Sequence, residues 1–227
     1  FKAVPLTGVK ANVSFDNELR KHSSKNVVAL LPGKTRPDEY VLYSAHWDHL
    51  GHCQAAPDGD DICNGAVDNA TGTAALVALA EANVKAGPTD RSQVFLAVTA
   101  EESGLLGSAY YGDNPVFPFA KTVGGVNMDA LSLAGLAKNV VVIGKGKSQL
   151  DAYLDRALGA QGRVATNEPT PEKGFYYRSD HFSFAKHGLP MLYFEGGEDL
   201  VNGGTAAGMA AAEGGLDGFY AVRLERL

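Results

Sequence analysis

Short β-rich apolar runs alternate along the chain with longer segments in which apolar residues recur at helical spacing. Several of the runs show little polar alternation, which is typical of strands buried on both faces. We expect strands at Asn26 to Leu31, Tyr40 to Ala45, Gln93 to Thr99, Val123 to Met128, Asn139 to Ile143 and Met191 to Phe194. Helices are expected at Thr71 to Ala86, at Ser148 to Leu158 and over a shorter stretch after Glu102.

This alternation predicts an α/β fold with a mostly parallel sheet covered by helices on both sides. A chain of 227 residues, with 45% hydrophobic and 20% charged residues, suits one such domain with a sizeable core. Residues 1–24 are more polar and are interpreted as an arm leading into a catalytic domain at 25–227. From Gly203 on, Gly and Ala dominate, which fits either a helix flanked by glycines or a frayed tail.

Charge and hydropathy narrow the classes of partner. Twenty basic against 26 acidic residues give a net charge of −6, and no run of Lys or Arg suggests a surface for nucleic acid. No apolar stretch approaches the roughly 20 residues that cross a bilayer. We therefore expect neither nucleic acid nor membrane as a partner.

The two cysteines and the N-terminus bear on localisation. Cys53 and Cys63 bracket a polar loop that a disulfide would close in an oxidising compartment, although two unpaired thiols remain the alternative. The sequence opens without Met and without an apolar signal-peptide core, and is interpreted as a mature or excised fragment. The expected location is periplasmic or secreted.

Acidic residues and a histidine follow the ends of the predicted strands. In open α/β sheets, ligands bind at the carboxyl ends of the strands. The residues in question are His46 and Asp48 after the second strand, Glu101 and Glu102 after the third, Asp129 after the fourth, and Asp68 just before the long helix. Grouped carboxylates repel one another and lose hydration, so a cation is needed to neutralise them. The pattern indicates a divalent metal site.

Each of these residues also has a simpler interpretation when taken alone. Asp68 fits a helix N-cap, and Asn69 or Thr71 fits that role equally well. The pair Glu101 and Glu102 fits a solvated loop. His46 fits a hydrogen-bonded histidine near the surface. The metal site is favoured because four separate strand or helix ends carry such groups.

Five segments together resemble the M28 metallopeptidases. They are SAHWDHLG, NGAVDNATGTAALVALAEA, FLAVTAEESGLLGSAYY, VNMDAL and RSDHFSFAKHGLPMLYFEGG, in this order between about residues 40 and 200. The resemblance implies a three-layer α/β sandwich with a central mixed, mostly parallel sheet. It also implies a zinc-dependent aminopeptidase that removes N-terminal residues from peptides.

The resemblance assigns a role to each residue of the cluster. His46 and Asp129 would bind one of two zinc ions, Glu102 the other, and Asp68 would bridge them. Glu101 would be the general base towards a metal-activated water, and Asp48 would orient His46. The Asp68-Asn69 peptide bond would be cis. We further expect Glu101 and Glu102 to point in opposite directions, because successive side chains do so in extended backbone.

One departure from the family pattern concerns the zinc that Glu102 binds. The family supplies a late histidine as its third ligand, whereas the last histidines here are His181 and His187. Either the C-terminal end is truncated or altered, or His181 substitutes, and the first interpretation is preferred. The Glu102-side ion is therefore expected to be weak or absent.

Three functions remain open at this stage. The first is the aminopeptidase. The second is a glutaminyl-cyclase-like acyltransferase on the same fold, for which fewer metal ligands would suffice. The third is a non-catalytic module in which the incomplete metal site is structural. The intact HxD element and the Glu101-Glu102 pair favour hydrolysis. The arm also resembles the segment that follows an inserted protease-associated domain in some M28 proteins.

Overall fold

The computed structural model describes residues 2, 4, 7–19 and 21–218, with the backbone alone for residues 212–218. The strands in this part of the chain are β1 Val27–Leu31, β2 Arg36–His46, β3 Gly51–His52, β4 Ile62–Cys63, β5 Arg91–Val98, β6 Thr122–Asn127, β7 Asn139–Val142, β8 Val164–Asn167 and β9 Met191–Gly196. The α-helices are α1 Ala70–Ala86, α2 Leu106–Asp113, α3 Leu150–Gly159, α4 His181–Ala185 and α5 Gly204–Gly218. Single 3-10 turns lie at Phe119–Lys121, Pro171–Lys173 and Phe175–Tyr177.

Seven of the described strands form one mixed sheet in the order β1-β5-β2-β6-β9-β7-β8. The central neighbours β5, β2, β6 and β9 run parallel to one another. β7 is antiparallel to β9 and parallel to β8, and β1 is antiparallel to β5. The carboxyl ends of the four central strands therefore lie along the same edge.

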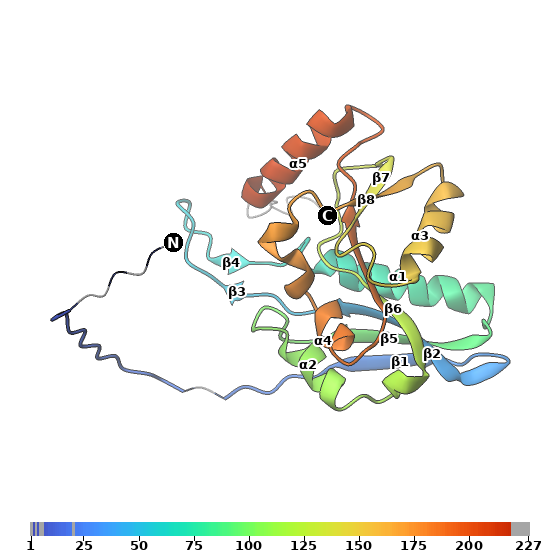
Figure 1. The fold of residues 1–227 in the computed structure, drawn as a ribbon, viewed down its shortest axis with the longest axis horizontal. Coiled ribbons are helices and arrows are strands. Elements are labelled where there is room, and N and C mark those ends of the chain that lie inside the picture. Colours follow the sequence, from blue (N-terminus) through green and yellow to red (C-terminus); the bar gives the residue numbers. More distant parts are fainter. Residues whose placement is uncertain (1, 3, 5–6, 20, 219–227) are drawn as a thin grey trace.

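Helices cover both faces of this sheet (Figure 1). Alternate residues of β5 face opposite layers, because successive side chains of a strand point to opposite faces. Leu96 packs in a cluster with Tyr111 of α2 and Phe184 of α4, whereas Phe95 packs with Leu76 of α1. The predicted three-layer sandwich with a mixed, mostly parallel central sheet is confirmed.

Local sequence explains where α1 begins and ends. The Asn69 side chain accepts a hydrogen bond from the Gly72 amide at 3.0 Å, as an N-cap does. At the other end, Gly87 adopts a φ of 88°, a conformation open to glycine, and Pro88 follows. Because Asn69 provides the cap, the carboxylate of Asp68 is left available for another role.

The strands and helices expected from the sequence are all present, with ends shifted by a few residues. The late Gly- and Ala-rich segment is the helix α5, not a frayed tail. Four of the described strands and α-helices were not predicted: the four-residue strand β8, the two-residue strands β3 and β4, and the five-residue helix α4. The described residues up to 24 form neither helix nor strand and are exposed.

The loop between β2 and α1 is closed by a disulfide. Cys53 and Cys63 are bonded, and the antiparallel pair β3 and β4 lies at this crosslink. The bridge ties the segment after His46 to the segment before Asp68. The alternative of two free thiols is not what the structure contains.

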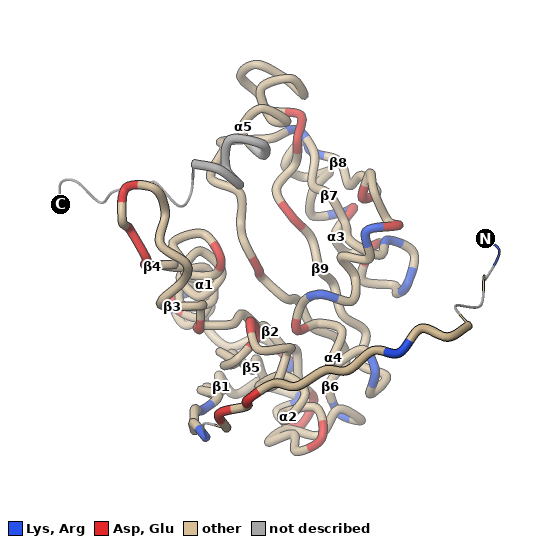
Figure 2. Tube along the Cα trace, turned by 90° about the vertical axis from the view of Figure 1, so that its left-hand side faces the viewer, with Lys and Arg blue, Asp and Glu red and all other residues tan. Residues whose placement is uncertain are grey.

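Lys and Arg are scattered along the described chain and do not gather on one element (Figure 2). None of the helices within the described residues has the length and apolar character needed to span a bilayer.

Truncating the core of the sheet tests this packing. Leu96 is fully buried between the sheet and helices α2 and α4. Leu96→Ala should lower the free energy of unfolding by about 2–5 kcal/mol, because it removes buried apolar atoms and leaves a cavity. Leu136, which is 82% exposed, offers a matched control whose change to Ala should alter stability by less than about 0.5 kcal/mol. Urea unfolding measures both, and equal losses would contradict this assignment of the core.

Candidate metal centre

The carboxyl edge of the central sheet gathers the acidic residues and the one histidine, His46, predicted from the sequence. His46 is the last residue of β2 and pairs with Val98, the last residue of β5. Glu101 and Glu102 follow β5 in a turn, and Asp129 follows β6. Asp68 enters the same edge from the loop before α1. Parallel pairing therefore brings four separate segments to one place.

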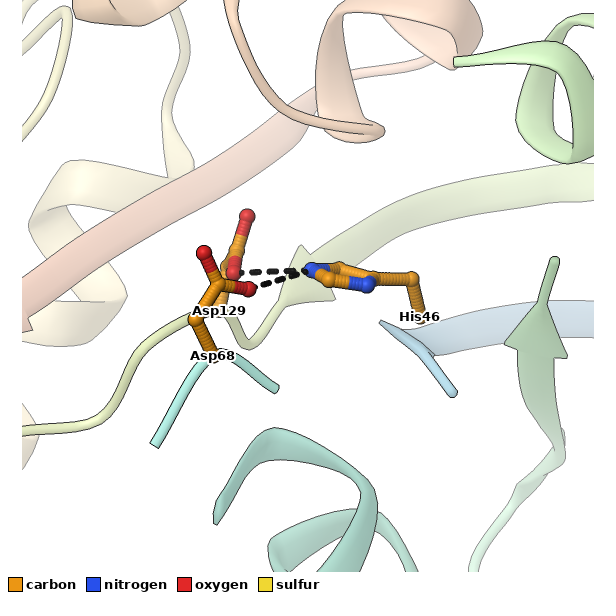
Figure 3. Close-up of side chains that lie close together, drawn as sticks. All are labelled: His46, Asp68 and Asp129. Atoms are coloured by element: carbon orange, nitrogen blue, oxygen red, sulfur yellow. Dashed lines mark hydrogen bonds and ion pairs between the residues drawn. The ribbon is translucent and has the colours of Figure 1, made fainter. Parts of the chain in front are cut away.

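His46 lies at the centre of the first group, facing two carboxylates (Figure 3). Its Nε2 atom is 3.1 Å from Asp129 Oδ1 and 3.1 Å from Asp68 Oδ1. Its Nδ1 atom is 3.2 Å from the backbone carbonyl oxygen of Asp48. A carbonyl can only accept, so Nδ1 carries the proton in the neutral ring. Nε2 then offers a lone pair towards two carboxylate oxygens.

Three acceptors that meet in this way require positive charge between them. Burial lowers the pKa of His46, but the contacts with the Asp129 and Asp68 carboxylates and the nearby negative charges together outweigh burial and raise it to about 11. For Asp129, burial raises the pKa, but the hydrogen bond and charge of His46, together with the hydrogen bond from Ser179, outweigh burial and lower the pKa overall. In the absence of a metal, a proton on Nε2 provides the charge. A divalent cation can replace that proton and neutralise both carboxylates.

A buried chain of hydrogen bonds fixes Asp129. The Ser44 hydroxyl of β2 donates to Asn127 Oδ1 at 2.7 Å, and Asn127 Nδ2 donates to Ser179 Oγ at 2.8 Å. Ser179 in turn donates to Asp129 Oδ2 at 2.6 Å. Because Oδ2 is occupied by Ser179, Oδ1 is the oxygen directed at His46. Such support is typical of ligand carboxylates.

A second group lies beside the first and shares Asp68 with it. His49, Asp68 and Glu102 place one ligand atom each within 4.8 Å of one another, as do His46, Asp68 and Asp129. His49 Nδ1 is 2.5 Å from Glu102 Oε1. His49 Nδ1, Asp68 Oδ1 and Glu102 Oε1 are all inaccessible to solvent, and none forms a hydrogen bond of good geometry, although Asp68 Oδ1 also lies 3.1 Å from His46 Nε2. Buried polar atoms without partners are rare, and converging ones fit a bound ion.

Asp48 contacts the turn that carries the two glutamates. Its Oδ1 accepts from the Glu101 amide at 3.1 Å and its Oδ2 from the Glu102 amide at 3.4 Å. Its Oδ1 is also 3.7 Å from His46 Nδ1, too long for a hydrogen bond, and the backbone oxygen of Asp48 is the nearer acceptor. The Asp48 carboxylate thus links the end of β2 to the start of the Glu101-Glu102 turn.

Glu101 and Glu102 lie in a turn and not in extended backbone. The premise from which their opposite directions were expected is therefore wrong: Ala100 has a φ of 54°, and the Glu101 carbonyl accepts from the amides of Gly104 and Leu105 at 2.9 Å. The turn directs Glu102 to His49. Glu101 stays outside both groups, and burial raises its pKa to about 8.

A cavity of about 460 Å³ opens next to the turn. Its lining consists of Glu101, Glu102, Gly104, Leu105, Tyr177 and Arg178. A second cavity of about 440 Å³, between β1 and α1, is lined mostly by apolar side chains, and its lining includes no residue of the two metal groups. The first cavity is therefore the candidate substrate site.

The peptide bond between Asp68 and Asn69 is cis, which the family resemblance implied. Asn69 is buried and donates to the Met128 carbonyl at 3.0 Å. The hydrogen bond from Asn69 to Met128 connects the loop before α1 to the segment that carries Asp129.

His181 belongs to neither group. Its ring is completely buried, with its centroid 4.5 Å from that of Tyr193 and 4.9 Å from that of Tyr176. Burial lowers the pKa of His181 to about 4. Substitution of His181 for the missing ligand has no support in this geometry.

His49 is the one member of the two groups that the sequence analysis gave no role. The sequence shows it next to the HxD element, but its contact with Glu102 depends on the path of the loop up to Asp68. No spacing rule predicts that path. The other four members, His46, Asp68, Glu102 and Asp129, were singled out because each one follows a strand or precedes a helix.

Comparisons with known proteins agree with this geometry. The sequence model of the family described as "Peptidase family M28" matches residues 26–213. A mouse protein named Aminopeptidase NAALADL1 is 32% identical over 128 residues, which cover 54% of this chain and 16% of that protein. The chain thus spans about a sixth of the length of this relative.

Solved structures share the fold. BSAP, a zinc aminopeptidase from Bacillus subtilis, superposes with a TM-score of 0.53 at 24% identity, covering 75% of this chain and 39% of the other. A glutaminyl cyclase from Porphyromonas gingivalis superposes with a TM-score of 0.57 at 20% identity, covering 75% and 62%.

Zinc binding at the carboxyl edge of the sheet can be tested by measuring the free energy of unfolding. Imidazole and carboxylate ligands suit zinc. Free zinc at about one hundred times its dissociation constant should raise the free energy of unfolding by about 2.7 kcal/mol, because only the folded chain assembles the groups. Urea unfolding with and without a chelator measures the difference. Asp129→Asn should reduce the stabilisation by zinc. A wild-type chain whose free energy of unfolding does not change with zinc would contradict the metal site.

Proposed function

Because the chain belongs to peptidase family M28, we propose that it is a zinc-dependent aminopeptidase that hydrolyses N-terminal residues from peptides. The observation that carries the proposal is the pair of ligand groups sharing Asp68 at the carboxyl edge of the sheet. Because the two groups share Asp68, they would hold two adjacent ions. The names of the mouse and Bacillus relatives point to the same activity.

The ligand roles follow the two groups. His46 and Asp129 would hold one zinc ion, Glu102 would hold the other, and Asp68 would bridge them. When bound, zinc supplies Lewis-acid activation of a water molecule and of the scissile carbonyl. The converging acceptors around His46 Nε2 and the partnerless atoms around Glu102 support this assignment.

Glu101 is proposed as the general base. Its carboxylate is not engaged in either ligand group and lines the cavity beside Glu102. From that position it takes a proton from the attacking water and returns it to the amine that leaves. The hydrogen bonds from the Glu101 and Glu102 amides to Asp48 hold the turn that presents both carboxylates.

The substrate site is proposed to lie in the same cavity. Tyr177 and Arg178 line it together with Glu101 and would contact the peptide. The side-chain preference of this site stays open. The scattered Lys and Arg residues support the expectation that nucleic acid is not a substrate (Figure 2).

A glutaminyl-cyclase-like acyl transfer is the second candidate, because a cyclase shares the fold. Hydrolysis is favoured by the second ligand group, since a two-ion site can activate water and the carbonyl separately. A non-catalytic metal module is the third candidate, and the free carboxylate of Glu101 argues against it.

Replacing Glu101 separates these functions. Glu101→Gln should lower kcat/KM for aminoacyl p-nitroanilides by about a hundredfold or more, because the amide cannot accept the proton. Its zinc content should stay unchanged, since Glu101 is not a ligand. Glu81→Gln on the exposed face of α1 is the matched control.

Cyclisation of N-terminal glutaminyl peptides is measured on the same samples. Release of the chromophore by wild type, lost in Glu101→Gln, is the expected result. Cyclisation without hydrolysis would favour the second candidate, and zinc binding with neither activity would favour the third. Full hydrolytic activity in Glu101→Gln would overturn the role of Glu101.

We also propose that the protein works outside the reducing cytoplasm. The support is the bond between Cys53 and Cys63, which closes a loop leading into the metal centre. Mass spectrometry of the non-reduced protein from its source cells should find these thiols joined. Free thiols in that material would contradict the proposed location.

A further inference from the structure

We propose that His49 is a zinc ligand, and that with Glu102 and Asp68 it holds the second ion of this chain. The inference rests on the proposed function and adds a residue to which the sequence analysis gave no role. It also bears on the expectation of a weak or absent second ion, because it supplies a third protein ligand.

The contacts of His49 fit those of a metal ligand. Nδ1 is 2.5 Å from Glu102 Oε1, and neither atom forms a hydrogen bond of acceptable geometry. Asp68 Oδ1 completes the set of buried atoms without partners. An ion pair between His49 and Glu102 would leave Asp68 Oδ1 facing only His46 Nε2, at 3.1 Å, whereas one ion would bind all three atoms of this group.

The composition of the two groups is parallel. Each has one histidine, one carboxylate of its own and the shared Asp68. Three protein ligands with one open position is the arrangement of catalytic zinc sites. Among the residues that the structure describes, no other histidine joins Glu102 in a group of this kind.

The backbone around His49 holds the ring in place. Gly65 has a φ of 66°, and a Cβ atom built there would lie 2.7 Å from His49 Cβ and 2.9 Å from its Cγ. Only glycine allows this close approach. Gly65 comes three residues before Asp68, and its carbonyl accepts from the Ala70 amide at 2.9 Å.

The disulfide makes this contact part of a closed loop. Cys53 and Cys63 lie between His49 and Gly65, and their bond fixes the return of the chain. His49 lies just before this loop and Asp68 lies after it, ahead of α1. Two of the three ligands of the second group are therefore positioned before any ion binds, which limits the entropy lost on binding.

Zinc binding to the whole 227-residue chain tests the inference without reference to turnover. Wild type, stripped with a chelator and dialysed against buffered free zinc, should retain two ions per chain by elemental analysis. His49→Ala should retain the ion of the His46 group and bind the second at least about tenfold more weakly. His52→Ala is the matched control, since this neighbouring histidine is 79% exposed and pairs with Asp61 outside the site.

A double variant separates ligation from indirect effects. Glu102→Ala should lose the same ion, and His49→Ala combined with Glu102→Ala should bind zinc no more weakly than Glu102→Ala alone. Cobalt substitution gives a second readout, in which the visible absorption of the second ion disappears in His49→Ala. Circular dichroism of the stripped proteins checks that each variant is folded.

The failures of the two proposals differ. Unchanged affinity for the second ion in His49→Ala, or a wild type that binds a single ion, would overturn the role of His49 and leave the aminopeptidase assignment standing. A folded wild type that binds no zinc would overturn both.

Discussion

The structure depends on positive charge at one point, where Nε2 of His46 meets the carboxylates of Asp68 and Asp129 at 3.1 Å. Each of these groups is an acceptor when the ring is neutral, so the arrangement repels itself unless a proton or a metal lies between them. The pKa of His46 is raised to about 11 for the same reason: the two carboxylates stabilise the protonated, positively charged ring. A metal ion would supply this positive charge and leave the His46 imidazole neutral. The adjacent group of His49, Asp68 and Glu102 would hold a second ion in the same way.

The rest of the fold brings these ligand side chains together and keeps them there. Parallel pairing of β5, β2 and β6 brings their carboxyl ends to one edge, and the hydrophobic layers on both faces hold the sheet against the repulsion. The buried chain from Ser44 to Ser179 fixes which oxygen Asp129 presents. In the second group, the disulfide-closed loop fixes the position of His49, whose side chain lies close to the backbone of Gly65. The surrounding sheet, hydrogen bonds and disulfide therefore hold the ligand residues close together, although their carboxylates repel one another.

Much of this was predictable from the sequence because it depends on local rules. Strands buried on both faces form continuous apolar runs, and the residues that follow them, such as His46 and Asp129, fall at the carboxyl edge in any parallel α/β sheet. The short strand β8 lacked such a run. The contact between His49 and Glu102 was not predictable, because it is set by the path of a loop closed by a disulfide. The turn at Ala100 likewise could not be predicted, since positive φ at a non-glycine residue follows from tertiary packing.

Anomalous scattering from a crystal of the zinc-loaded chain, recorded on both sides of the zinc absorption edge, tests the central claim most directly. The account predicts two peaks that share Asp68, one among His46, Asp68 and Asp129 and the other among His49, Asp68 and Glu102. A map from a zinc-saturated crystal with no peak at the carboxyl edge of the sheet, or with peaks only elsewhere on the molecule, would contradict it.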